Sequence, residues 1–208
     1  MAAGAKKSSE AKVAKWNRPW AGIALVVLSL VALYCAFGLL ASELQVLHDP
    51  DSALGCDINP LVGCSDSLMS SSAHLFFGFP NSAVGLLAFG ALLGVSAVLM
   101  FGNGLPQFLW WVMAAGITLG MGYVAYFLYL SVAVFASLCP YCMGIWFAIL
   151  SASPLIWFSA LASGAFGKSA RRNGKVLLRY WWAVAIGLYL IVILVIVLGM
   201  PDKIAMLF

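Results

Sequence analysis

Four of the five cysteines fall into two pairs along the chain, and paired thiols are the residues here best suited to chemistry. Cys139 and Cys142 are separated by two residues at the start of a long apolar stretch. Two thiols at this spacing can close a disulfide within one helical turn or share a metal ion. Cys56 and Cys64 form the second pair. The chemistry open to these residues is thiol–disulfide exchange, structural cross-linking or zinc binding.

The composition places these cysteines in a membrane protein. The chain has 208 residues, of which 64% are hydrophobic and 9% are charged, whereas soluble domains carry about 25% charged residues. A membrane-spanning helix needs about 20 apolar residues, and it satisfies its own backbone hydrogen bonds in lipid. The sequence therefore predicts an all-α integral membrane protein. Five stretches are long enough, at about residues 20–41, 82–101, 108–130, 138–161 and 180–200.

Basic residues set the predicted orientation of the five spans. Lysines and arginines form one block before the first span and a second block within residues 163–179, and none lies between residues 19 and 167. Cytoplasmic segments carry such an excess of basic residues. We therefore expect a cytoplasmic basic tail at 1–19, a cytoplasmic basic loop at 163–179 and an extracytoplasmic tail at 201–208. Contact with anionic lipid explains the basic blocks, so no nucleic-acid partner is expected.

On this topology the largest loop, residues 42–80, lies outside the cytoplasm together with the second cysteine pair. Ser67 is predicted to cap a short helix in this loop, which runs to about Phe77 and covers the ends of the spans. Asn81 begins the second span, where it could cap the helix or face a ligand. Small-residue spacing predicts close helix packing in the second and third spans, at Gly90, Gly94, Gly116 and Gly120.

All four paired cysteines then share the side of the membrane on which disulfides form and persist. A cysteine at the N-terminus of the fourth span would gain thiolate stability from exposed N–H groups and the helix dipole. Two structural disulfides are an alternative, but Cys139 and Cys142 enclose almost no chain, so their bond would remove little entropy. A four-cysteine zinc site is another, to which the spacing of Cys56 and Cys64 is poorly suited. Exchange between the pairs is favoured, and no metal is expected.

Electrons released by disulfide formation need an acceptor. The sequence has no motif for haem, flavin or an iron–sulfur cluster. An apolar cavity between the spans, with a dithiol at its rim, would suit a lipid-soluble quinone. Asn81 could hydrogen-bond a carbonyl oxygen of such a quinone.

Four motifs occur with a specific combined spacing: Gly55-Cys56-Asp57-Ile58-Asn59-Pro60, Cys64, Phe77-Gly78-Phe79-Pro80-Asn81 and Leu138-Cys139-Pro140-Tyr141-Cys142. With these motifs the chain resembles bacterial members of the vitamin K epoxide reductase family over about residues 20–162. The resemblance implies a catalytic four-helix bundle around a quinone pocket, followed by a fifth transmembrane helix at 180–200. Because no thioredoxin-like domain follows that helix, we expect a separate thioredoxin-like (DsbA-like) protein as the partner.

The resemblance implies a role for each paired cysteine. Cys142 would lie next to the quinone. Cys139 would be its disulfide partner and would exchange with Cys64. Cys56 would meet the thiol of the partner protein and, together with Cys64, carry its electrons inward.

The resemblance also implies contacts around the quinone. Asn81 would hydrogen-bond it, and Trp146 stands where the family often has a tyrosine. A supporting serine follows the second loop cysteine in the family, and by spacing it corresponds to Ser70. Two further loop residues are ambiguous. His74 is expected to be an ordinary polar contact above the cavity, and Asp57 either disfavours a thiolate at the neighbouring cysteine or orients the loop.

The expected function is that of a quinone-dependent thiol–disulfide oxidoreductase in the bacterial cell (inner) membrane. It would oxidise the thioredoxin-like partner and pass the electrons to menaquinone or ubiquinone, which supports disulfide-bond formation in exported proteins. The alternative is a non-enzymatic scaffold or transporter whose disulfides are structural. Transporters tend to carry broken helices or charges within their spans, and no charged residue lies in the middle of a predicted span.

Overall fold

The first helix is longer than its apolar stretch. The computed structural model describes residues 18–49, 54–59, 61–75 and 78–205. Helix α1 spans Pro19–His48, with a proline in its first turn. It therefore continues past residue 41, where the sequence predicted the loop to begin, because the leucine, glutamate and glutamine residues that follow are good helix formers. The added turns carry Glu43 into the protein, where it is buried.

Three further helices complete a four-helix bundle. Helix α3 spans Asn81–Met100, α4 spans Gln107–Leu130 and α5 spans Pro140–Ser163. Each begins at a proline or directly after one, because the fixed φ and missing N–H of proline suit a helix start. A π-helical segment, Ser131–Phe135, extends α4, and α5 ends at Gly164 with a φ of 89°. Glycine adopts this left-handed conformation without strain.

The basic segment after α5 is mostly helical. Helix α6 spans Lys168–Leu177, a 3₁₀ segment covers Leu178–Tyr180, α7 spans Trp181–Gly199 and the short α8 spans Pro201–Ala205. Helix α6 packs against α5 at Gly174, where a Cβ atom would overlap the α5 backbone. The predicted basic loop is therefore largely a helix, because lysine, arginine and alanine favour helix even where the chain is polar.

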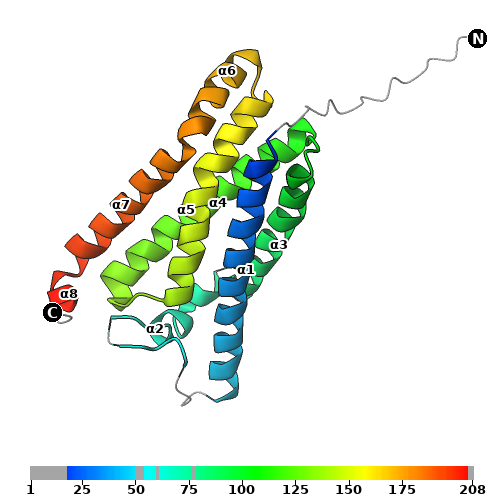
Figure 1. The fold of residues 1–208 in the computed structure, drawn as a ribbon. Coiled ribbons are helices and arrows are strands. Elements are labelled where there is room, and N and C mark those ends of the chain that lie inside the picture. The colour runs from blue at the N-terminus through cyan, green and yellow to red at the C-terminus, as the bar shows by residue number, and fades with distance from the viewer. Residues whose placement is uncertain (1–17, 50–53, 60, 76–77, 206–208) are drawn as a thin grey trace, which may run out of the picture.

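Helices α1 and α5 form the centre of the bundle (Figure 1). Helix α1 packs against α3 and α5, and α5 also contacts α4, α6 and α7. Within the described residues, five helical segments are long and apolar enough to cross a membrane, and no β-strand forms. The prediction of an all-α membrane protein with five spans is confirmed. Figure 1 places α6 and the start of α1 at one end of the bundle and α2 at the other.

Close helix contacts occur at glycines other than those predicted. A Cβ atom at Gly22 would overlap the backbone of α3, and one at Gly144 would overlap the Sγ atom of Cys35. Gly90 and Gly94 of α3, in contrast, have no neighbouring atom within 4 Å of a Cβ position. The prediction that these two residues bring helices together is therefore wrong, because α1 contacts a different face of α3.

The loop between α1 and α3 forms two short helical turns. Helix α2 spans Ser65–Leu68, and a 3₁₀ segment spans Ser71–His74. The prediction that Ser67 caps a longer helix is wrong, because α2 begins earlier and Asp57 accepts hydrogen bonds from N–H groups at its start. Phe77, the expected end of that helix, lies outside the described residues.

Candidate active site

Backbone pairing brings the two cysteine pairs together. The N–H of Leu138 donates to the carbonyl of Leu61 at 2.8 Å, and the N–H of Gly63 donates to the carbonyl of Leu138 at 3.1 Å. These bonds belong to a parallel bridge between the loop and the segment before α5. Cys64 and Cys139 are the next residues along the two segments. Their Sγ atoms consequently lie 3.3 Å apart.

Two loop side chains hold this pairing in place. The Oδ1 atom of Asn59 accepts hydrogen bonds from two loop N–H groups, each at 2.9 Å. The Asp57 carboxylate accepts from the N–H of Cys64 at 2.6 Å, from the N–H of Ser65 at 3.2 Å, and from the Ser65 hydroxyl. Burial raises the pKa of Asp57, but these hydrogen bonds outweigh it and hold the pKa below its usual value. Asp57 thus orients the loop.

One cysteine pair is oxidised and the other is reduced. Cys56 and Cys64 form a disulfide with Cα atoms 5.8 Å apart, whereas Cys139 and Cys142 are free thiols. All four residues are buried. The disulfide occupies two of the four thiols that the alternative zinc site would need. In the part of the chain that the structure describes, no group of three or more His, Cys, Asp or Glu residues is arranged to hold a metal ion.

Cys139 has the environment of a nucleophilic thiol. It is the N-cap residue of α5, and its Sγ atom accepts the N–H of Cys142 at 3.4 Å. A hydrogen bond from the Cys142 thiol contributes most to lowering the pKa of Cys139; the N–H groups of Cys142 and Tyr141 add to it, and together they outweigh burial. The thiolate is the attacking form in disulfide exchange. Cys139 can therefore attack the sulfur of Cys64, which it contacts.

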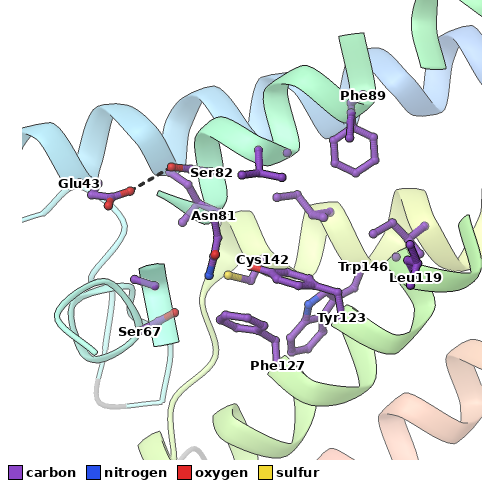
Figure 2. Close-up of a pocket in the computed structure, with 18 of the residues that line it drawn as sticks. Glu43, Ser67, Asn81, Ser82, Phe89, Leu119, Tyr123, Phe127, Cys142 and Trp146 are labelled. Atoms are coloured by element: carbon purple, nitrogen blue, oxygen red, sulfur yellow. Dashed lines mark hydrogen bonds between the residues drawn. The ribbon is translucent and has the colours of Figure 1, made fainter. Parts of the chain in front are cut away.

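Cys142 lies in the wall of an apolar cavity between α1, α3, α4 and α5 (Figure 2). The cavity has a volume of about 370 Å³, and pockets for small molecules typically have roughly 300–1,000 Å³. Phe89, Leu119 and Phe127 are among its apolar lining residues. Its polar lining side chains include Glu43, Ser67, Asn81, Ser82 and Tyr123. Figure 2 shows Glu43 and Ser67 on the side of the pocket away from Trp146 and Leu119, with Tyr123 beside Cys142.

Both residues that the sequence placed against a quinone line this pocket. Trp146 is buried in its wall. The Nδ2 atom of Asn81 donates to the carbonyl of Ser72 at 2.6 Å, and its Oδ1 atom accepts the N–H of Leu75 at 3.1 Å. The amide thus ties the 3₁₀ segment to the start of α3 rather than capping α3. A further hydrogen bond links the Asn81 side chain to the phenol of Tyr123 in the pocket wall.

The serine carried over from the resemblance lies elsewhere. Ser70 is not among the residues that line the pocket, and its hydroxyl donates to the carbonyl of Ser67 at 2.8 Å. Ser67 itself lines the pocket and is buried. Ser67 lies in α2, whereas Ser70 follows the end of α2 with extended backbone, so spacing along the chain was a poor guide to which serine faces the cavity.

Sequence reasoning missed most residues of the pocket, among them Glu43, Tyr123, Gly116 and Gly120. The last three follow the three- and four-residue spacing of one helix face, which was the available signal. The two glycines were predicted to pack helices together. Both line the α4 wall of the cavity. A Cβ atom at Gly116 would meet no neighbouring atom within 4 Å, whereas one at Gly120 would lie in van der Waals contact with Ile149 of α5.

A comparison with protein families covers this whole site. The model of the Vitamin K epoxide reductase family matches residues 23–157, which is more than half of the chain. The chain belongs to the vitamin K epoxide reductase family. The matched range contains both cysteine pairs and every residue that lines the pocket. Vitamin K epoxide reductase chemistry is membrane redox chemistry that links thiols and disulfides to a quinone, and a dithiol beside an apolar cavity fits that chemistry.

Proposed function

We propose that this protein oxidises a thioredoxin-like partner and passes its electrons to a membrane quinone through the two cysteine pairs. One observation carries the proposal. Cys139, a free thiol with a lowered pKa, contacts the Cys64 sulfur of a closed disulfide, while its neighbour Cys142 lines an apolar pocket. Two purely structural disulfides would not need to touch, so the contact favours exchange over the scaffold alternative.

The reaction begins at the loop disulfide. A thiolate of the partner attacks Cys56, and Cys64 leaves as a thiolate. The second partner thiol then displaces Cys56, so the partner becomes a disulfide and the loop pair becomes a dithiol. Cys56 is only 5% exposed, so this step requires the loop around Gly55 to move away from the bundle.

Electrons next move from the loop pair to the pair at α5. The Cys64 thiolate attacks Cys139 in a Cys139–Cys142 disulfide, and Cys142 leaves at the pocket wall. Cys56 then attacks Cys64, and Cys139 leaves as a thiolate. The products are a Cys56–Cys64 disulfide with free Cys139 and Cys142, which is the bonding in this structure.

The pocket residues complete the cycle at Cys142. Re-forming the Cys139–Cys142 bond releases two electrons and two protons, and a quinone such as menaquinone or ubiquinone accepts both when bound. Trp146 lines the space that such a ligand would occupy, and the linked Asn81 amide and Tyr123 phenol offer hydrogen-bonding groups to a carbonyl oxygen. A pocket with one polar end and apolar walls suits a ring carrying a lipid-like tail.

Charge placement supports an extracytoplasmic location for the cysteines. The basic helix α6 lies at the end of the bundle opposite α2 (Figure 1). Cytoplasmic ends of membrane proteins carry the excess of lysine and arginine. With α6 in the cytoplasm, the loop faces the compartment in which exported proteins acquire disulfides, and this is the inner-membrane arrangement that we propose.

The test is a quinone-reduction assay with two electron donors, reduced thioredoxin and dithiothreitol. Cys139→Ala and Cys142→Ala are expected to abolish quinone reduction with both donors. Cys56→Ala is expected to lose turnover with thioredoxin but to keep some with dithiothreitol, which can reach the α5 pair directly. Cys35→Ala, which removes a buried thiol outside the exchange path, serves as the control. Full activity of Cys142→Ala would overturn the proposal, and equal loss with both donors in Cys56→Ala would overturn the role of that residue.

A further inference from the structure

A buried carboxylate lies in the pocket wall and is linked to the surface through one histidine. The side chain of Glu43, on α1, is 6% exposed, and its Oε1 atom lies 2.9 Å from the Nε2 atom of His74. The Ser82 hydroxyl donates to Oε2 at 2.9 Å. The His74 side chain, in contrast, is 38% exposed. The pair therefore extends from the pocket to the surface of the protein (Figure 2 shows Glu43 and Ser82).

This pair should hold a proton. A buried carboxylate is costly unless it is neutralised or paired with a cation. No lysine or arginine occurs between residues 19 and 167, and His74 is the potential cation that contacts Glu43 in the described residues. Either the carboxyl group carries a proton or the imidazole does. Histidine changes its charge within the physiological range and can exchange that proton with water.

Among the described residues that line the pocket there is no lysine, arginine or histidine to replace His74 beside Glu43. The phenol of Tyr123, on α4, interacts electrostatically with both Glu43 and Cys142, and all three residues line the pocket. From α3 Glu43 is approached by Ser82 and Asn81, which do not titrate. The remaining titratable groups around the pocket can therefore only add negative charge.

We propose that Glu43 and His74 form the proton carrier of the quinone site. This inference rests on the proposed function. Formation of the Cys139–Cys142 bond releases two electrons and two protons, and reduction of a quinone to its quinol consumes the same number of each. Glu43 takes up the two thiol protons one after the other at the pocket and delivers each to the reduced quinone, and so returns to its starting state after each turnover. His74 acts through Glu43 by holding its charge and exchanging protons with water.

The experiment uses the full chain in detergent, reduced with dithiothreitol and mixed with a short-chain ubiquinone in a single turnover. Glu43→Gln is expected to slow quinol formation by about 10²-fold, which is the usual contribution of a general acid–base group. Both Glu43→Gln and His74→Gln are expected to flatten the pH dependence of that rate. His48→Gln is the matched control. His48 is an exposed histidine at the end of α1, the helix that carries Glu43, and its substitution should leave the rate of quinol formation and the pH profile unchanged.

A second measurement does not depend on turnover. The reduced protein is oxidised with ferricyanide in the absence of quinone, and the infrared difference spectrum is recorded. Proton transfer to the pair predicts a change in the carboxyl bands that is absent in Glu43→Gln and present in His48→Gln. Should Glu43→Gln fail to fold, His74→Gln, which alters an exposed side chain, still tests the pH profile.

The outcomes separate this inference from the function on which it rests. A wild-type protein that reduces no quinone with any thiol donor refutes the proposed function itself. A wild-type protein that does reduce quinone, with the same pH profile in Glu43→Gln and His74→Gln and no carboxyl change on oxidation, refutes the proton carrier alone.

Discussion

Asp57 holds the loop that carries the Cys56–Cys64 disulfide, so its removal should speed reduction of that disulfide. In Asp57→Ala the N–H groups of Cys64 and Ser65 and the Ser65 hydroxyl lose their common acceptor. Cys56 is 5% exposed in the closed loop. Attack on its sulfur therefore proceeds from an open form of the loop, whose population this substitution raises.

The size of the effect follows from the cost of losing a helix cap. Removal of a capping side chain costs about 0.5–2 kcal/mol, and the aspartate is exposed, so its charge adds little because solvent screens it. Since about 1.4 kcal/mol corresponds to a factor of ten in an equilibrium constant, the open population should rise by roughly 2- to 30-fold. The rate of disulfide reduction should rise by the same factor when opening is a rapid pre-equilibrium.

The assay is reduction of the Cys56–Cys64 disulfide by dithiothreitol, followed by thiol alkylation and mass spectrometry. Asp57→Asn is the matched control, because asparagine caps helices about as well as aspartate. We expect Asp57→Ala to be reduced faster than wild type and Asp57→Asn to react at close to the wild-type rate. An unchanged rate in Asp57→Ala, or an equal rise in both variants, would show that capping by Asp57 does not control access.

The same carboxylate gives the loop a pH dependence with a defined sign. The pKa of Asp57 is lower in the folded protein than its ordinary value of 3.8. Its stabilising contribution is therefore fully present above that ordinary value and is lost as the pH falls through the lower folded pKa. Loop opening measured with a phosphine reductant should increase below about pH 4 in wild type, and Asp57→Ala should lack this increase.

Two further predictions test the pocket and the packing beside it. Gly116→Leu should raise the KM for quinone by about 10-fold, because the added side chain enters the cavity and overpacking costs about 1–3 kcal/mol. The control Gly122→Leu, on an exposed face of the same helix, should leave the KM unchanged. A KM of Gly116→Leu equal to that of wild type would show that this wall does not contact the ligand. Gly144→Ala should lower the melting temperature because its Cβ would overlap Cys35 Sγ, and Cys35→Ala in the same chain should restore it; lack of rescue would place the strain elsewhere.

Hydropathy predicted the number of spans but not the ends of the helices. The five apolar stretches became membrane-length helices because lipid leaves the backbone no other partner. Helix α1 nevertheless continues to His48, and α6 forms within the basic segment. In both places the side chains are more polar while the backbone remains helical. The helix therefore extends beyond the apolar residues from which hydropathy would predict it. The π-helical segment Ser131–Phe135 likewise has no counterpart in composition.

The cysteines of the site were predictable and its proton-bearing groups were not. The two-residue spacing of Cys139 and Cys142 predicted their redox chemistry, and helix α5 begins at Pro140, as prolines often mark a helix start. Glu43 appeared to be a loop residue because it follows the apolar stretch. Its place in the pocket depends on how far α1 extends and on how α1 and α3 pack, which brings Ser82 against its carboxylate. Which residues of two helices face each other is decided by how the helices pack, and a single sequence does not reveal this packing.

The arrangement of the four sulfur atoms suggests how thiol exchange could be given a direction. Exchange between Cys64 and Cys139 is reversible, and contact between them alone favours neither side. The two ends of the chain of thiols differ, however: Cys56 belongs to a loop, whereas Cys142 opens onto an apolar cavity. Both sulfur atoms are buried, but a protein thiol can reach Cys56 once the loop opens, whereas Cys142 is held within the helical bundle on α5. Under the proposed function, removal of electrons at Cys142 then draws the exchange one way, and burial of that cysteine prevents the partner from reversing it.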